Sequence, residues 1–282
     1  MRKFRVRRAG VVRYCTLYVA AALVLFVSLF PFLWMVSTSF KPPSETFTRV
    51  PRLIPVHPTL ENYRIVLGET MIPRYFLNSV YVALLTTAIS LVVAALGAYG
   101  FSRFRFPGRS PALLMILSVQ MFPSVVIIIP LFIVMRNLHL LNTHYSLLVS
   151  YTTFTLPLCV WMLKGFFDGI PRELEEAALI DGCSKFGAFL RIALPLSAQG
   201  IVASAIFAFI GAWNEFMFAM TFINIEELKT MPVGLTSFFG RFTVEWNPLM
   251  AASVLFTIPS LVFFVFVQRN LARGLVSGAV KG

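Results

Sequence analysis

A polar segment of the chain carries acidic residues, small residues and a glycine at a fixed spacing. Glu176 is followed by Ala177 and Ala178, and Gly182 comes six residues after Glu176. Three further positions complete the pattern, namely Ile192, Leu194 and Pro195. A carboxylate can form a charge-assisted contact with a basic residue, and small side chains let another backbone approach closely. The segment offers no nucleophile, histidine or metal-binding set, so it predicts docking and not catalysis.

Two short helices joined by an elbow are expected to position these residues. Pro171 fits the first turn of the first helix, and the acidic residues that follow it suit the positive end of the helix dipole. Gly182 is expected to stop this helix in a left-handed turn. Ser184 can cap the second helix, and Pro195 is expected to end it.

The second of these helices carries an apolar stripe. Four of its residues recur at helical spacing, namely Phe186, Phe189, Leu190 and Ala193. The stripe predicts a face that enters a groove of a partner protein. The alternative is a helix that lies on lipid headgroups. An anionic lipid surface would repel the acidic residues of the first helix, Glu173, Glu175 and Glu176, which favours docking to a protein.

The composition indicates a membrane protein. Hydrophobic residues make up 58% of the 282 residues and charged residues 13%, and the mean hydropathy is +0.80. Soluble domains carry roughly 25% charged residues, and this chain has too few acidic groups to cover a soluble surface. The net charge of +12 does not indicate nucleic-acid binding, because the basic residues cluster beside apolar segments without interleaved aromatic residues.

Six segments are apolar and long enough to cross a hydrocarbon core, which needs about 20 helical residues. They cover 14–36, 76–101, 111–134, 145–167, 200–222 and 248–267. Each span must satisfy its backbone hydrogen bonds internally, and the sequence lacks the alternating segments of a membrane barrel. The expected fold class is therefore all-α, a polytopic membrane protein with six transmembrane helices.

The distribution of lysine and arginine sets the expected topology. Most of the 24 basic residues fall on one side of the membrane if the N-terminus is cytoplasmic, as the positive-inside rule requires. Both termini are then cytoplasmic, with a basic N-terminus at 1–13 and a tail at 268–282. The transmembrane domain over 14–267 has long outer loops at 37–75 and 223–247, and the docking segment at 168–199 is cytoplasmic.

The sequence contains no phosphate-binding loop of the G-x-x-x-x-G-K type, so the chain is not expected to hydrolyse ATP. Its three cysteines and three histidines show no spacing typical of a disulfide or a metal site. We therefore expect a chain that is not an enzyme and that holds no cofactor or metal itself.

Six further fragments follow one another along nearly the whole chain. They are Ser39-Phe40-Lys41-Pro42, Pro58-Thr59-Leu60-Glu61-Asn62-Tyr63, Tyr99-Gly100-Phe101-Ser102-Arg103, Met121-Phe122-Pro123, Ala212-Trp213-Asn214-Glu215 and Gly278-Ala279-Val280-Lys281-Gly282. In this order they resemble the carbohydrate-importer permeases of the maltose and glycerol-phosphate type, and in particular the shorter, six-helix partner of the two permeases. The docking segment resembles the EAA loop of the same ABC importer permeases, in residue type and in spacing.

The resemblance implies a type I importer fold and a machine of five parts. This chain would form a heterodimer with a second permease, and two ATPase subunits would carry ATP and magnesium. An extracytoplasmic solute-binding protein would deliver a sugar, such as a malto-oligosaccharide or another disaccharide. The ATPase would contact Glu175, Glu176, Ala177, Ala178, Asp181, Gly182, Phe186, Phe189, Ile192, Leu194 and Pro195. The chain is then expected in the plasma (inner) membrane of a prokaryote as a multi-pass protein.

A few polar residues within the predicted spans are candidates for the sugar path or for a gate. They are Asn78, Gln120, Trp213, Asn214 and Glu215. Polar groups inside spans usually face the bundle interior or a wet cavity. Glu215 is expected in the outer third of the fifth span, where a carboxylate facing lipid would cost about 2.5 to 3.5 kcal/mol. An alternative role for such residues is to join helices or anchor the outer gate.

Two other classes of function are compatible with a helical bundle. An ion-coupled secondary transporter should carry inverted repeats or several carboxylates within its spans, and Glu215 is the one such carboxylate in the predicted spans. A membrane enzyme would need a catalytic constellation near one interface, and the segment around Glu176 offers carboxylates alone.

Overall fold

Helices account for nearly all of the regular structure. The structure, a computed structural model, describes the backbone of residues 2–279 and the side chains of residues 14–265. Within this range there is no strand, and a single isolated bridge joins Phe239 and Val244. The prediction of an all-α fold is confirmed. The basic side chains of 1–13 and 268–282, on which the predicted topology partly rests, lie outside the described side chains.

Within the described residues, four helices are long and apolar enough to cross a membrane, and two bent helix pairs bring the number to six if each pair is one span. The four are α1 (Arg2–Ser39), α4 (Ile72–Arg103), α7 (His144–Asp168) and α14 (Trp246–Ala279). One bent pair joins α5 (Arg109–Ser118) and the 3-10 turn η1 (Val119–Met121) to α6 (Ser124–Asn137). The other leads from Lys185–Leu196 into α11 (Ala198–Trp213).

The predicted third span over 111–134 is not one straight helix. The two parts of this bent pair differ in direction by 101°. Phe122 has an extended backbone, with φ −84° and ψ 126°, because the ring of Pro123 disfavours the helical conformation for the residue before it. Pro123 also has no amide hydrogen with which to continue the helix. The single-helix prediction is therefore corrected to two helices that meet at a proline.

The predicted fifth span over 200–222 is also divided. α11 ends at Trp213, and a short helix, α12 (Met217–Phe222), starts after the non-helical residues 214–216. At its other end, α11 follows the segment Lys185–Leu196 after a bend of 76°. Glu215 therefore lies in a break between two helices and not within a continuous span.

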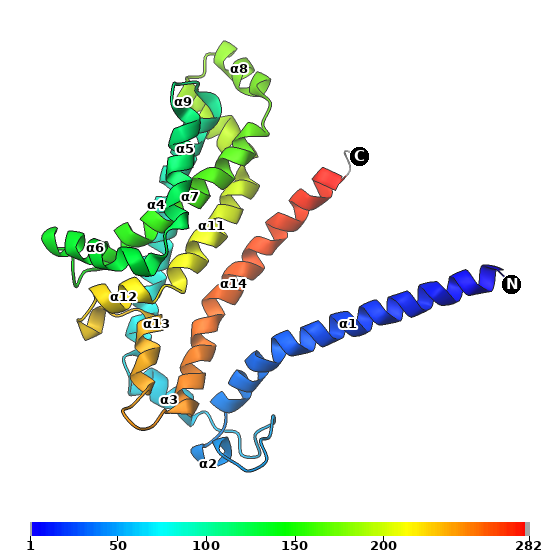
Figure 1. The fold of residues 1–282 in the computed structure, drawn as a ribbon, viewed down its shortest axis with the longest axis vertical. Coiled ribbons are helices and arrows are strands. Elements are labelled where there is room, and N and C mark those ends of the chain that lie inside the picture. Colours follow the sequence, from blue (N-terminus) through cyan, green and yellow to red (C-terminus); the bar gives the residue numbers. More distant parts are fainter. Residues whose placement is uncertain (1, 280–282) are drawn as a thin grey trace. The chain divides into compact units, whose positions relative to one another are not determined.

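α4, α7 and α11 pack side by side and form the centre of one compact unit, residues 71–236 and 256–282 (Figure 1). One part of this core surrounds Trp213, whose ring stacks on the rings of Phe209 and Phe256. Another part surrounds Phe167, next to small residues of α4 such as Ala94 and Ala98. Small residues let two helices approach closely, so this packing explains the tight contact of α4 with α7.

Three short helical turns follow α12, namely η3 (Glu226–Leu228), α13 (Met231–Gly234) and η4 (Leu235–Phe238). Polar side chains of α4 bind this segment. The Asn78 amide donates to the carbonyl oxygens of Glu227 (2.9 Å) and Lys229 (2.8 Å), and the Ser79 hydroxyl accepts from the N–H of Met231 (2.7 Å). Asn78 thus fixes a loop, which fits the alternative role of joining elements better than contact with a sugar.

The other unit, residues 1–70 and 237–255, contains α1, α2 (Pro43–Thr46) and α3 (Glu61–Gly68). Its polar residues meet at the carbonyl oxygen of Lys41, which accepts hydrogen bonds from the amides of Asn62 (2.9 Å) and Asn247 (2.8 Å). The Lys41 ammonium is buried and donates to the carbonyl of Arg52 (2.7 Å). The fragments at 39–42 and 58–63 therefore contain residues that hold this unit together.

Acid is expected to loosen this unit at Glu45. The Glu45 carboxylate accepts the backbone N–H groups of Val56 (2.8 Å) and His57 (2.9 Å), and the bond from Val56 is the main cause that lowers the pKa of Glu45. Because the folded-state pKa lies below the unfolded one, this stabilisation is present above the unfolded pKa and is lost as the pH falls through the folded pKa.

Hydrogen exchange of the Val56 and His57 amides, corrected for the intrinsic rate, should therefore accelerate on acidification. Glu45→Gln should remove this pH dependence, because glutamine does not titrate. Equal protection of both amides above and below the folded pKa would contradict the prediction.

Candidate functional site

The docking segment folds as the predicted pair of short helices. α8 (Arg172–Ile180) begins directly after Pro171 and lies beyond the end of α7 (Figure 1). It ends with two hydrogen bonds, from the N–H of Cys183 to the carbonyl of Ala178 (2.9 Å) and from the N–H of Gly182 to the carbonyl of Leu179 (3.1 Å). Gly182 has a φ of 86°, a left-handed conformation that glycine adopts at little cost. The predicted stop at Gly182 is confirmed.

The second helix starts as predicted and runs further. The Ser184 hydroxyl accepts the N–H of Gly187 (3.0 Å) and caps α9 (Lys185–Ala188). The π-helical turn η2 (Phe189–Ala193) and then α10 (Leu194–Leu196) continue the helix, so the prediction that Pro195 ends it is wrong. A proline removes one backbone hydrogen bond and crowds the preceding turn. The wider π-helical turn directly before Pro195 relieves this crowding.

The apolar stripe of the second helix faces two ways. Phe189 and Ala193 are 4% and 0% exposed and belong to the core around Phe167. Phe186 and Leu190 are 60% and 45% exposed. The prediction that the whole stripe enters a groove of a partner is therefore wrong for Phe189 and Ala193, because helices of the same chain already cover them.

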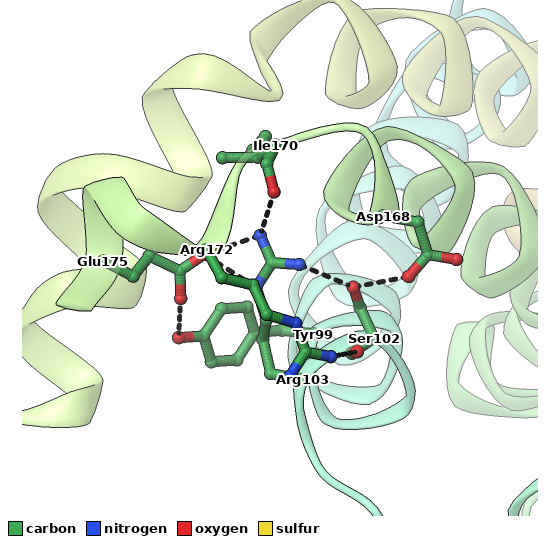
Figure 2. A network of polar contacts seen from close by, with 7 residues as sticks. All are labelled: Tyr99, Ser102, Arg103, Asp168, Ile170, Arg172 and Glu175. Atoms are coloured by element: carbon green, nitrogen blue, oxygen red, sulfur yellow. Dashed lines mark hydrogen bonds and ion pairs between the residues drawn. The ribbon is translucent and has the colours of Figure 1, made fainter.

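Glu175 points into the protein. Its side chain is 9% exposed, and it is the one buried residue of α8, all of whose residues are described. Both of its carboxylate oxygens are bonded, Oε1 to the Nε of Arg103 (2.7 Å) and Oε2 to the hydroxyl of Tyr99 (2.6 Å) (Figure 2). Residues of the same chain enclose the Glu175 carboxylate, so it is not exposed for the predicted contact with the ATPase.

Further hydrogen bonds join the ends of α4 and α7 to α8 (Figure 2). The Arg103 guanidinium donates to the carbonyl of Ile170 (3.1 Å) and to the hydroxyl of Ser102 (3.2 Å). Ser102 in turn donates to the carboxylate of Asp168 (2.7 Å), and Arg172 donates to the carbonyl of Ser102 (3.3 Å). The sequence analysis does not predict that Arg103 binds the docking segment, although the fragment Tyr99-Gly100-Phe101-Ser102-Arg103 contains this arginine.

The other predicted contact residues lie mainly at the surface. Glu176, Ala177, Asp181, Gly182 and Pro195 are exposed, and Ala178, Ile192 and Leu194 are half-buried. Ile180, which was not predicted, is 87% exposed. We call the exposed residues Glu176, Ala177, Ile180, Asp181, Phe186 and Leu190 the docking surface. It combines carboxylates with large exposed apolar side chains, which is typical of a surface that binds another protein.

A second candidate site is a cavity of about 240 Å³ among α6, α7, α11 and α12. Two of the five predicted path or gate residues, Gln120 and Glu215, line it. Trp213 does not line it, because its indole N–H donates to the carbonyl of Phe256 (3.2 Å) within the aromatic core. Asn214 is exposed, and its amide donates to the carbonyl of Ile210 (2.9 Å). Neither residue lines this cavity, and their place at a path shared with a second permease stays a prediction.

Glu215 is fixed at the start of α12, where its carboxylate accepts the N–H groups of Phe218 (2.9 Å) and Ala219 (3.2 Å). The Tyr151 hydroxyl is buried beside this carboxylate and has no hydrogen-bond partner of normal geometry among the described residues. Aromatic rings, including that of Phe154, complete the lining. A cavity with convergent polar groups and aromatic rings can bind a small polar molecule. No three His, Cys, Asp or Glu side chains in the described part of the chain are placed to hold a metal.

Comparisons with known proteins agree along nearly the whole chain. The sulfoquinovosyl glycerol transport system permease protein of Agrobacterium fabrum is 38% identical over 265 residues, which cover 94% of this chain and 93% of that protein. The trehalose/maltose transport system permease protein of Thermococcus litoralis is 38% identical over 278 residues, or 98% of this chain and 99% of that protein. The diacetylchitobiose uptake system permease protein of Streptomyces coelicolor is 38% identical over 262 residues, with coverages of 93% and 95%.

A solved structure shares the fold. In the crystal structure of a bacterial ABC transporter involved in the import of the acidic polysaccharide alginate, one chain matches with a TM-score of 0.82 and 22% identity, covering 93% of this chain and 97% of that one. Residues 87–277 match a family described as binding-protein-dependent transport system inner membrane component. The chain therefore belongs to the family of inner membrane components of binding-protein-dependent transport systems.

Proposed function

We propose that this chain is the membrane-spanning permease subunit of an ATP-driven, binding-protein-dependent sugar importer. The names of relatives that match nearly full length refer to trehalose and maltose, to diacetylchitobiose and to sulfoquinovosyl glycerol, which supports a saccharide or glycoside as the substrate. The polar and aromatic lining of the cavity at Glu215 and Tyr151 is compatible with such a molecule. Family membership favours this function over an ion-coupled secondary transporter or a membrane enzyme.

The observation that carries the proposal is an exposed docking surface on α8 and the helical segment after it, with α8 hydrogen-bonded to α4. The importer would contain this chain, a second permease, two ATPase subunits that bind ATP and magnesium, and an extracytoplasmic solute-binding protein. Closure of the ATPase pair on ATP would displace the docking surface. Because α8 is hydrogen-bonded to α4, and α4 in turn to the segment that follows α7, its displacement would reach the spans. Such a contiguous link can supply the coupling free energy that alternating access requires.

The proposal includes a location and a topology. The chain would lie in the inner membrane of a prokaryote with both termini in the cytoplasm, which places α8 on the side of the ATP supply. The outer loops at 37–75 and 223–247 would then face the solute-binding protein.

Reconstitution of the importer in lipid vesicles tests this function. Affinity purification of the chain should bring down two ATPase subunits and a second permease. ATP hydrolysis by this complex should rise when the solute-binding protein and one class of sugar are added together, and the same sugar should enter the vesicles. A purified complex without an ATPase would contradict the proposal.

Glu176 is expected to pair with a basic residue of the ATPase. Glu176→Lys should reduce the amount of ATPase that co-purifies by about tenfold, because it replaces a charge-assisted contact with a repulsion. Glu176→Gln, which keeps the shape and a hydrogen-bond acceptor, should reduce it far less. Glu173→Lys is the matched control, since Glu173 is an exposed carboxylate of the same helix outside the docking surface. Equal co-purification with the lysine and glutamine variants of Glu176 would rule out the pairing.

A further inference from the structure

The contact between α8 and α4 is polar. α8 has nine residues and is joined to its neighbours through the short linkers 169–171 and 181–184. Its one buried side chain is the carboxylate of Glu175, and apolar Leu174 and Ile180 are exposed. The apolar side chains of α8, including Leu179 and Ala178, are only partly covered, so they do not by themselves fix the orientation of α8.

The contact restrains orientation as well as distance. Tyr99 and Arg103 are one helical turn apart and share a face of α4. The Nε and Nη2 atoms of Arg103 both lie 2.7 Å from Oε1 of Glu175, and the Tyr99 hydroxyl lies 2.6 Å from Oε2 (Figure 2). Rotation or sliding of α8 would break at least one of these bonds. An apolar contact would tolerate such sliding, because it has no directional requirement.

The linker before α8 is restrained by the same residues. Arg103 donates to the carbonyl of Ile170, which lies in this linker (3.1 Å). Arg172, the first residue of α8, donates to the carbonyl of Ser102 near the end of α4 (3.3 Å). Arg103 of α4 thus donates to the linker before α8, and Arg172 of α8 donates back to α4.

We propose that Glu175, Arg103 and Tyr99 form a positioning latch that makes α8 and the end of α4 move as one body. The proposal rests on the proposed function, since it gives the latch the task of carrying motion from the docking surface to the spans. The neighbouring carboxylates then have different tasks: Glu176 faces the partner and Glu175 transmits its motion inward. A buried ion pair adds little net stability over an apolar pair of equal volume, so the benefit of this pair lies in orientation.

A distance measurement tests the latch without any transport. Spin labels are placed at Ile180 of α8 and Val92 of α4, which are 87% and 61% exposed, in the full-length chain in lipid nanodiscs. Cys15 and Cys183, which are exposed and half-buried, are replaced by serine. The otherwise unchanged chain should give one narrow distance distribution, and Glu175→Gln should broaden it. Glu173→Gln, which removes an exposed carboxylate of the same helix, should keep the narrow distribution.

Transport per ATP is the second measurement. In the reconstituted importer, Glu175→Gln should lower the sugar transported per ATP hydrolysed by about tenfold, within the range of 5- to 150-fold that is typical of coupling between sites. ATPase co-purification should stay normal, in contrast to Glu176→Lys. Tyr99→Phe removes one hydroxyl. It should lower the sugar transported per ATP less than Glu175→Gln does, and it should also broaden the distance distribution. This variant tests the latch even if Glu175→Gln fails to fold.

The outcomes separate the latch from the proposed function. Narrow distributions and normal transport per ATP in both variants would overturn the latch. A broad distribution with normal transport per ATP would overturn its role in coupling. If the unchanged importer transports no sugar, the proposed function is wrong, and the distance measurement decides by itself whether the latch positions α8.

Discussion

Gly182→Val is expected to reduce sugar-stimulated ATP hydrolysis by about tenfold or more while the chain remains inserted in the membrane. Gly182 has a φ of 86°, which is in the left-handed region. This conformation costs a residue with a Cβ roughly 1–2 kcal/mol, and a β-branched residue more. A Cβ at this position would meet no atom within 4 Å. The effect is therefore one of backbone strain, which would open the hydrogen bond from Cys183 to Ala178 and change the angle of the elbow.

The matched control for this prediction is Gly182→Asn. Asparagine enters the left-handed region far more readily than valine, and the space around Gly182 admits its side chain. This variant should keep at least half of the normal ATPase stimulation. Membrane abundance and ATPase co-purification are measured for both variants, so that loss of coupling is distinguished from loss of protein. Normal stimulation in the valine variant would show that the elbow angle does not matter for coupling.

Glu215→Ala is expected to reduce sugar uptake by about tenfold, with normal membrane abundance and normal ATPase assembly. The Glu215 carboxylate accepts the N–H groups of Phe218 and Ala219 and lies beside the buried hydroxyl of Tyr151. Alanine would leave the two amides without these acceptors, at a cost of about 1–3 kcal/mol for each buried donor that stays unsatisfied. The start of α12 and the shape of the cavity would change together.

Two variants sharpen this test. Glu215→Gln keeps one amide oxygen as an acceptor and should retain more uptake than Glu215→Ala. Asn214→Ala removes an exposed neighbouring side chain whose amide donates to the carbonyl of Ile210 in the preceding helical turn. This variant should leave uptake nearly unchanged. Uptake is measured with labelled sugar in vesicles at saturating binding protein. Unchanged uptake in Glu215→Ala would exclude a role for this carboxylate in the path or the gate.

The elbow could be predicted from the sequence because it depends on local rules. A glycine accepts a left-handed conformation, and a serine caps a helix, whatever the rest of the protein does. Gly182 and Ser184 both follow these rules. The inward direction of Glu175 depends instead on Arg103, which is far away in the sequence. Two adjacent carboxylates look equivalent until the fold shows which of them meets the arginine.

The prolines show the same limit within the spans. Pro157 lies inside the unbroken helix α7, which has many buried residues along its length, whereas Pro123 separates α5 from α6. α5 has no buried residue, and α6 has Met135 alone. Pro130 lies inside α6 and Pro31 inside α1, and both helices continue through the proline although few of their side chains are buried. The sequence shows where the prolines are, but neither local preference nor burial alone shows which of them breaks a span.

The two hydrogen bonds to the carbonyl of Lys41 form at different times during biosynthesis. The carbonyl accepts a hydrogen bond from the amide of Asn62, which is made soon after Lys41, and one from the amide of Asn247, which follows 206 residues after Lys41. At roughly 5–20 residues per second, a ribosome needs about 10 to 40 seconds to cover that interval. During this time the unit that contains Asn62 lacks the last of its polar contacts. The segment between Lys41 and Asn62 is therefore most vulnerable to proteases after α1 has been made and before α14 has been made.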